Sequence, residues 1–314
     1  MEMRSLGATG VELSVIGLGA WAMGGPWEYG WGPTDDDASI ATIHRALDLG
    51  INWIDTAAAY GLGHAEDVIQ RALKGRHERV FIATKCGMVW DYQGVVNNDL
   101  RPKSIRAEVE ASLRRLGVDV IDLYQIHWPD PEEKAPLEES WGTMADLVKE
   151  GKVRFIGASN FDVEDMERCR PIHPLASLQP PYNMLRRGVE DAILPYCKQH
   201  NIGVIPYSPM ASGLLTEGFD IEHTAPDDWR RRDFGEATLR RASAVVAKLR
   251  PLAERHNATV AQVAVAWVLR RPEVSSAIVG ARRVWQVEQN AGAAAVRLTE
   301  ADLGEIEAIL SDAT

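Results

Sequence analysis

The sequence predicts an α/β protein: one (β/α)8 TIM barrel over residues 1–314, with an N-terminal β-hairpin and an extra C-terminal helix. Eight short apolar runs alternate with segments of helical periodicity, and eight strand–helix units are the number that closes such a barrel. The runs are apolar at almost every position, which is typical of parallel strands covered by helices. The 314 residues also fit one barrel, since these domains commonly reach ~250 residues or more.

The eight predicted strands are short runs bounded by polar residues or glycine. They cover residues 14–19, 51–55, 79–85, 120–127, 153–159, 175–179, 202–207 and 275–280. Residues 2–14 are predicted to form the hairpin, which would close the bottom of the barrel.

The segments between these runs carry apolar residues three or four positions apart, the spacing of one helix face. Thr34 and Asp37 resemble the capping box of a helix start. Pro102 fits the first turn of a later helix, and Gly117 fits its C-terminal end. Two further apolar stripes comprise Trp141, Met144 and Val148, and Val260, Val263, Ala264 and Trp267.

An open, doubly wound sheet is the competing fold. Residues 15–25, VIGLGAWAMGG, match the G-x-G-x-x-A fingerprint of a dinucleotide-binding turn at Gly17, Gly19 and Ala22. That turn should lead directly into a helix. GGPWEYGWGP follows instead, and its glycines and prolines break helices. The sequence therefore favours a barrel strand and its loop here.

Composition and charge argue against several partners. The chain has 45 acidic and 34 basic residues, a formal net charge of −11, which disfavours nucleic acid and anionic membranes. Cys86, Cys169 and Cys197 are far apart, so they predict neither a zinc ribbon nor a disulfide framework. The sequence has no apolar run typical of a signal peptide or a membrane span, so a cytoplasmic protein is expected. The oligomeric state stays open.

Polar side chains stand where the predicted strands stop, and in a TIM barrel those ends form the active-site rim. Asp55, Lys85 and His127 end the second, third and fourth strands, and Tyr60 follows in the loop after Asp55. The next three strands end in Ser159–Asn160, Gln179 and Tyr207–Ser208. Each residue alone is compatible with a structural role, but together they predict one functional site.

The residue types in this set point to acid–base chemistry on a carbonyl group. A tyrosine normally loses its proton near pH ~10. A neighbouring lysine stabilises the phenolate and lowers that pKa, while an aspartate holds the lysine in place. A histidine can orient or polarise a carbonyl oxygen. Such a site would protonate an alkoxide as it forms during hydride reduction.

At these residues the chain resembles the aldo-keto reductase superfamily over nearly its whole length. The segments that carry the resemblance are LGATGVELSVIGLGAW, DTAAAYG, ATKCG, QIHWPD, IGASNF, LQPPYN, YSPMASGLLT and VGARRVWQVEQNAG, in this order. Bacterial members with a short C-terminal end are the most similar, among them sugar, inositol and aryl-alcohol dehydrogenases. The resemblance implies a reductase that transfers hydride between a nicotinamide and an aldehyde, ketone or sugar carbonyl.

The resemblance also implies a role for individual residues. Tyr60 would be the general acid/base, Lys85 would lower its pKa, Asp55 would pair with Lys85, and His127 would orient the carbonyl. Ser159, Asn160 and Gln179 would hold the nicotinamide carboxamide, and Tyr207 would stack on its ring. Further cofactor contacts are implied for Gly19, Ala20 and Trp21 at the side, for Ser208, Met210, Ser212, Gly213 and Leu214 along the pyrophosphate, and for Gly280, Arg282, Gln286, Gln289 and Asn290 at the adenosine phosphate end.

Two departures from the family concern the choice of cofactor. Position 285 is Trp where relatives often carry Glu or Pro, and position 281 is Ala where many carry a phosphate-binding Ser. Arg282 and Arg283 remain as anion partners. NADP(H) is therefore the expected cofactor, with NAD(H) as the alternative, and no metal is expected.

The tryptophans predict an aromatic substrate pocket that suits sugar rings or aromatic aldehydes. Trp21, Trp90 and Trp128 follow strand ends directly and are predicted to bind substrate. For Trp27, Trp31 and Trp229, loop packing or a subunit interface is an equal alternative. The connections 88–101 and 208–240 are expected to shape the pocket.

Two other functions stay open on this fold. Potassium-channel β subunits share the barrel and the four catalytic-type residues, so a cofactor-binding regulatory subunit is one alternative. A metal-dependent sugar isomerase is the other, but it needs clustered acids and histidines at several strand ends. Only Asp55 and His127 meet that requirement.

Overall fold

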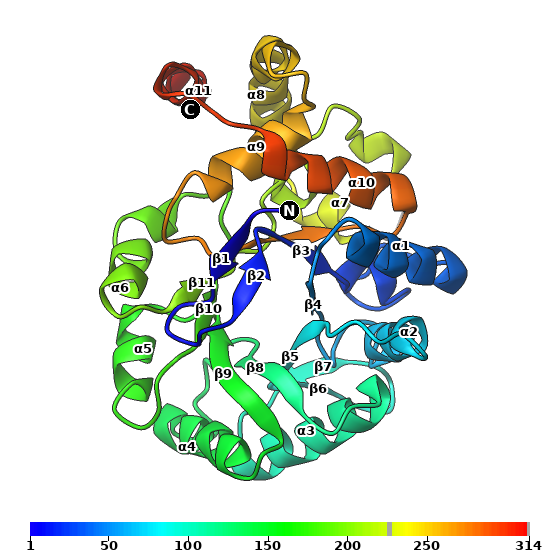
Figure 1. Cartoon of the computed structure of the whole chain (residues 1–314), viewed down its shortest axis with the longest axis vertical. Helices are drawn as coiled ribbons and strands as arrows, with labels where there is room; N and C mark the ends of the chain where they lie inside the picture. The colour runs from blue at the N-terminus through cyan, green and yellow to red at the C-terminus, as the bar shows by residue number, and fades with distance from the viewer. Residues whose placement is uncertain (225–227, 313–314) are drawn as a thin grey trace.

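The computed structural model describes residues 1–224 and 228–312, and these form the predicted parallel (β/α)8 barrel. Its eight strands follow the order β11-β10-β9-β8-β5-β4-β3-β12. Two backbone hydrogen bonds join the ends of this sheet: Ser275 N–H donates to Val204 C=O at 2.8 Å, and Ile278 N–H donates to Pro206 C=O at 2.9 Å. The helices form a ring around the strands (Figure 1).

All eight predicted strands are confirmed, and each observed end lies within three residues of the predicted end. Their bounds are β3 Ile16–Gly19, β4 Trp53–Asp55, β5 Phe81–Cys86, β8 Ile121–Ile126, β9 Val153–Ser159, β10 Ser177–Gln179, β11 Gly203–Val204 and β12 Ala277–Gly280. The seventh, β11, is the shortest. Pro206 lies at its end and Pro180 follows the neighbouring β10, and neither residue has a backbone N–H to extend the ladder.

The helices lie on the outside of the barrel. They are α1 Asp36–Asp48, α2 His64–Leu73, α3 Pro102–Leu116, α4 Leu137–Lys149, α5 Val163–Cys169, α6 Ile193–Gln199, α7 Trp229–Asp233, α8 Glu236–Arg255, α9 Val260–Leu269, α10 Val284–Gly292 and α11 Glu300–Asp312. The predicted C-terminal extra helix is α11. None of the described helices has the length and apolar character to cross a membrane.

Two details of the connections differ from the sequence prediction. Asp35, and not Thr34, caps α1, because its side chain accepts the Ala38 N–H at 3.1 Å. The connection 208–240, for which no helix was predicted, contains α7 and the start of α8. Like α11, α8 lies outside the eight strand–helix units. Residues 225–227 of this connection lie outside the described residues.

Two antiparallel hairpins accompany the barrel. The predicted N-terminal hairpin is formed by β1 (Met3–Ser5) and β2 (Glu12–Ser14). Leu6, which follows β1, and Leu13 of β2 are fully buried and pack with Trp53, Phe81 and Leu123 inside the barrel. The second hairpin, β6 (Met88–Trp90) with β7 (Val96–Asn98), fills the predicted long connection 88–101.

The glycine motif at residues 15–25 belongs to a barrel strand, as predicted. Gly17 lies within β3, and a Cβ atom there would come within 2.2 Å of the Trp53 indole ring. After Gly19 the chain makes only a short 3₁₀ turn, Trp21–Met23, and the first α-helix begins at Asp36. The first glycine of the apparent fingerprint therefore makes room for a core tryptophan.

Replacing Gly17 by Ala is expected to destabilise the fold. The buried Trp53 ring is held by an Nε1–H bond to Ser276 Oγ at 3.0 Å, so overpacking should lower the free energy of unfolding by about 1–3 kcal/mol or more. Urea denaturation measures this effect. Gly142→Ala is the matched control, because nothing lies within 4 Å of that helical position and alanine favours helices. Equal stability of the two variants would contradict this account of Gly17.

Candidate active site

The carboxyl ends of three neighbouring strands bring three of the four predicted catalytic residues together. Asp55 is the last residue of β4, Lys85 lies near the end of β5, and His127 directly follows β8. These strands pair β4 with β5 and β5 with β8 in parallel. Tyr60 reaches the same place from the loop after β4.

Lys85 is the centre of this group. Its Nζ donates to Asp55 Oδ1 and Oδ2 at 2.9 and 2.8 Å, to the Thr56 carbonyl at 2.8 Å, and to the Tyr60 hydroxyl at 3.1 Å. Gln179 Nε2 donates to Asp55 Oδ1 at 2.8 Å. The Lys85 side chain is fully buried. The ammonium group thus joins the carboxylate and the phenol in one network.

The loop that carries Tyr60 is held by close packing of two glycines. Gly61 has φ +62°, and a Cβ there would lie 1.8 Å from the carbonyl oxygen of Gly24. Only glycine fits such an approach with this backbone conformation. The contact fixes the Tyr60 loop against the turn after β3, and Tyr60 is left only 9 % exposed.

Burial and pairing act in opposite directions on Asp55 and Lys85. Burial raises the pKa of Asp55 and lowers the pKa of Lys85, whereas their attraction opposes both shifts. The carboxylate accepts from Lys85 with both oxygens and also from Gln179, and each of these bonds favours its charged form. The geometry is that of a buried ion pair.

The role predicted for Lys85, lowering the pKa of Tyr60, is opposed by the surroundings of the phenol. Burial raises the pKa of Tyr60 well above its ordinary value, and the negative charge of Asp55 adds to this shift. Tyr60 therefore keeps its proton at neutral pH, and the Lys85 N–H is in place to stabilise a phenolate once that proton has left.

His127 lies beside Tyr60, with 5.7 Å between the two ring centroids. Burial lowers the pKa of His127 well below its ordinary value, and the positive Lys85 lowers it further. The imidazole is therefore neutral at neutral pH. A neutral imidazole has one N–H to donate, which suits it to hold a carbonyl oxygen next to the Tyr60 hydroxyl.

The residues predicted to hold the nicotinamide carboxamide form one network next to this group. Ser159 Oγ donates to the Gln179 carbonyl at 2.8 Å, and Asn160 Nδ2 donates to Ser159 Oγ and to the His127 carbonyl, both at 3.0 Å. Tyr207 OH donates to Asn160 Oδ1 at 2.9 Å. Asn160 has φ +62°, a conformation that asparagine tolerates better than most residues.

The segment after Tyr207 makes a series of tight turns. Ser208, Ala211, Ser212 and Gly213 all have positive φ values, and such turns gather backbone N–H groups into a concave surface. Asn183 Nδ2 donates to the Ser208 carbonyl at 3.0 Å and fixes the start of the loop. Met210 closes its end, because its carbonyl accepts the N–H groups of Gly213 and Leu215 at 3.1 Å.

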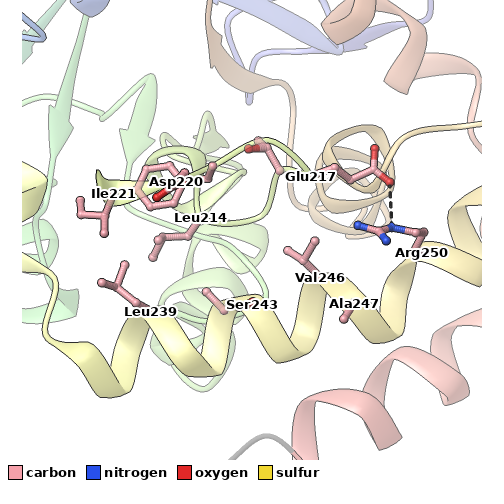
Figure 2. A pocket seen from close by; sticks show the side chains of 12 residues that line it. Leu214, Glu217, Asp220, Ile221, Leu239, Ser243, Val246, Ala247 and Arg250 are labelled. Atoms are coloured by element: carbon pink, nitrogen blue, oxygen red, sulfur yellow. Dashed lines mark ion pairs between the residues drawn. The ribbon is translucent and has the colours of Figure 1, made fainter. Parts of the chain in front are cut away.

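A cavity of about 290 Å³ lies on the outer side of this loop, between residues 214–221 and α8 (Figure 2). Leu214 lines it together with Leu239 and Val246 of α8, and Glu217 pairs with Arg250 at its edge at 3.7 Å. The side chain of Leu214 is therefore directed to this cavity, and its backbone N–H donates to the Ala211 carbonyl at 3.1 Å. The catalytic-type residues are not part of the cavity lining.

The chain after β12 supplies the predicted adenosine phosphate end. Gly280 of β12 pairs with Gly19 of β3, so neither strand carries a side chain at this pair of positions. Arg282 N–H donates to Gln286 Oε1 at 3.0 Å, and Asn290 Nδ2 donates to the Gly280 carbonyl at 3.2 Å. The Gln289 carbonyl accepts from Gln262 Nε2 at 2.8 Å. Trp285, which departs from the family, is 60 % exposed.

Arg282 is a half-buried cation with like charges around it. Burial lowers its pKa, and the nearby Arg283 and Arg230 lower it further. Within residues 1–224 and 228–312, no carboxylate lies at ion-pair distance from Arg282, whereas Arg230 is paired with Asp228 at 2.7 Å. The donor chemistry of this end therefore fits a phosphate, and together with the turns after Tyr207 it fits a dinucleotide.

The tryptophans of the loop after β3 lie in two different places. Trp21 packs edge-on against Trp31 and Trp229, with centroids 4.9 and 5.9 Å apart, so these rings join the loop after β3 to α7. For Trp27 the sequence left the substrate pocket and packing as equal alternatives, and its ring centroid is 6.0 Å from that of Tyr60. Its position in a glycine-rich loop after β3 was the only sequence signal for this.

The other two predicted substrate residues occupy different places on the rim. Trp128 follows His127 and is 42 % exposed. Trp90 lies on the β6–β7 hairpin with the Arg115 guanidinium 5.9 Å from its ring. Asn98 of the same hairpin donates to the Trp128 carbonyl at 3.4 Å, so hairpin and rim are connected.

A closed parallel barrel with a lysine, tyrosine, aspartate and histidine at its carboxyl rim defines a class of barrel oxidoreductases. Residues 15–311 match the model of the aldo/keto reductase family. The chain belongs to this family, whose members are oxidoreductases that use nicotinamide cofactors.

Three relatives show how closely this chain follows the family. Aldo-keto reductase YhdN of Bacillus subtilis is 40% identical over 99% of this chain and 94% of its own length. The NADH-specific methylglyoxal reductase of Escherichia coli is 36% identical over 96% of each chain. The structure of the glycerol dehydrogenase AKR11B4 from Gluconobacter oxydans is similar at a TM-score of 0.90, with 40% identity over 99% of this chain and 96% of that chain.

Proposed function

We propose that this protein transfers hydride between NADP(H) and an aldehyde, ketone or sugar carbonyl, with Tyr60 as the general acid/base. One observation carries the proposal: Lys85 Nζ contacts both Asp55 and the Tyr60 hydroxyl, while His127 lies beside the same phenol. When bound, the reduced nicotinamide would supply the hydride.

The protein's own residues would supply the binding and the proton. His127 donates its N–H to the carbonyl oxygen and places it beside the Tyr60 hydroxyl. As hydride reaches the carbonyl carbon, the oxygen becomes an alkoxide and takes the Tyr60 proton. The phenolate that remains accepts a hydrogen bond from Lys85, whose position Asp55 and Thr56 maintain. The oxidation of an alcohol would use the same steps in reverse.

The preference for NADP(H) rests on Arg282. It is half-buried, with Arg283 and Arg230 as well as Asp228 nearby, and no carboxylate of the described chain lies at ion-pair distance from it, so an additional phosphate would stabilise it. Arg283 is a weaker candidate, because Asp35 lies 3.9 Å from its guanidinium. The NADH-specific relative shows that the alternative cofactor occurs in this family.

Arg282→Ala is expected to weaken NADPH binding by roughly ten- to a hundred-fold, since one charge-assisted phosphate contact is worth about 1.5–3 kcal/mol. NADH lacks this phosphate and should bind the variant about as well as it binds the wild type. Dissociation constants measured by quenching of tryptophan fluorescence test both statements. Wild-type protein that binds NADH as tightly as NADPH would contradict the assignment.

Aromatic walls support a ring-shaped or aromatic substrate. We propose Trp21, Trp128 and Trp27 as substrate contacts, with Trp27 added because it lies next to Tyr60. Trp90 is a more remote candidate, since it lies against Arg115. The relatives named above extend the choice of test compounds to methylglyoxal and glycerol.

The test of the proposed function is cofactor turnover with a panel of compounds, with and without EDTA. The panel contains methylglyoxal, an aromatic aldehyde and an aldose with NADPH, and glycerol with NADP⁺. We expect oxidation of NADPH by at least one carbonyl, unaffected by EDTA. Tight cofactor binding without any turnover would instead favour a regulatory subunit, and sugar isomerisation that EDTA abolishes would favour a metal-dependent isomerase.

A further inference from the structure

A second carboxyl group lies behind the catalytic strands. Glu108 of α3 is 9 % exposed and directed to the end of β5. Both of its oxygens accept the Gly87 N–H, at 3.2 and 3.0 Å, and Ser104 Oγ donates to Oε1 at 3.3 Å. Glu108 has no role in the proton transfer described above.

The peptide unit that Glu108 holds connects two of the proposed catalytic strands. Its N–H belongs to Gly87, and its carbonyl belongs to Cys86, which directly follows Lys85. That carbonyl accepts the backbone N–H of His127 at 3.0 Å. A single peptide therefore lies between Glu108 on one side and the His127 backbone on the other, one residue from Lys85.

Within residues 1–224 and 228–312, no lysine or arginine lies at ion-pair distance from Glu108. Arg115 of α3 is the nearest positive group, but its Nε donates to Glu66 of α2 at 2.7 Å. Asp99 faces Glu108 from the loop after β7, and Cys86 of β5 and Tyr124 of β8 face it from the barrel. Burial raises the pKa of Glu108 to about 8, with Asp99 adding to the shift and Gly87, Ser104 and Arg115 opposing it.

We propose that Glu108 is a positioning residue whose protonation state sets the Cys86–Gly87 peptide, and through it the alignment of His127 with Lys85 and Tyr60. The ionised carboxylate makes a charge-assisted bond to Gly87 N–H, roughly twice as strong as a neutral one. This bond polarises the peptide and strengthens the bond from His127 to the Cys86 carbonyl. Protonation of Glu108 weakens both. The inference rests on the proposed function, since it concerns the same Lys85 and His127.

The test is the ratio of wild-type to Glu108→Gln turnover across pH, with methylglyoxal or another carbonyl that the wild type reduces. The amide keeps an oxygen for Gly87 N–H but cannot ionise. The ratio should be near one at about pH 6, where Glu108 is neutral, and should rise at least about threefold by about pH 9.5, in a single-proton step near pH 8. Glu110→Gln is the matched control, because Glu110 lies on the same helix and pairs at the surface with Lys152.

A second variant keeps the test decisive if Glu108→Gln folds poorly. Ser104→Ala removes one donor to the carboxylate, so it should move the step in the wild-type profile to higher pH. A ratio that is constant with pH, or a step that Ser104→Ala leaves in place, would overturn the proposal while the reductase assignment stands. An absence of turnover in the wild type would instead overturn the proposed function itself.

Discussion

Tyr60→Phe is expected to lower the turnover of carbonyl reduction by about 10²–10⁴-fold, the usual contribution of a general acid. Phenylalanine keeps the ring and its packing against Trp27 and His127, but it has no proton to transfer. Binding of NADPH should be nearly unchanged, because the phenol is held by Lys85 and is not a main cofactor contact. Steady-state kinetics and fluorescence titration of the cofactor measure the two effects separately.

The control for this variant is Tyr92→Phe. Tyr92 lies on the β6–β7 hairpin and is 94 % exposed, so loss of its hydroxyl should change neither turnover nor cofactor binding. If Tyr60→Phe weakened NADPH binding as much as it lowered turnover, Tyr60 would be a binding residue, and the role of general acid would have to be reassigned.

Lys85→Met is expected to have the second largest effect, on both activity and stability. The variant removes the hydrogen bond that stabilises the Tyr60 phenolate, so most of the activity should be lost. It also leaves Asp55 buried with Gln179 as its main remaining donor, and an unpaired buried charge costs about 3–5 kcal/mol. Urea denaturation at neutral pH should show this loss.

The double variant Lys85→Met with Asp55→Asn separates the two effects. It removes the unpaired carboxylate, so stability should recover in large part while activity stays low. The double variant Lys85→Met with Tyr60→Phe should have nearly the same activity as the less active of the two single variants, because the two residues act as one unit. Fully additive losses of activity would contradict the network centred on Lys85.

The sequence was sufficient for most of the fold because the signals were local and repeated. Apolar runs marked all eight strands, and Pro102 and Gly117 marked both ends of α3. The start of α1 was predicted one residue too early, since Asp35 and Thr34 are both good capping residues and only the backbone decides between them. The helix α8 was missed because it begins within the long connection 208–240, where no helix was predicted.

The site was predictable where it follows from strand ends and less so where it depends on contacts across the rim. The position of Lys85 at a strand end could be read from the sequence, and the resemblance implied its pairing with Asp55 and Tyr60, whereas its bond to the Thr56 carbonyl could not be predicted. The pKa of Tyr60 is raised by its burial and further by the charge of Asp55, and residue spacing reveals neither effect. The same holds for Trp27 and Glu108, whose distances to Tyr60 and Gly87 arise only from the folded chain.

Single-turnover reduction with limiting NADPH deuterated at the transferred position tests the central claim, proton donation by Tyr60, most directly. The loss of reduced-nicotinamide absorbance then reports the chemical step without product release. The account predicts that Tyr60→Phe slows this step by at least about a hundredfold, with an isotope effect at least as large as that of the wild type. A Tyr60→Phe rate above about a tenth of the wild-type rate, with chemistry limiting, would show that Tyr60 is not the acid and would make His127 the first candidate.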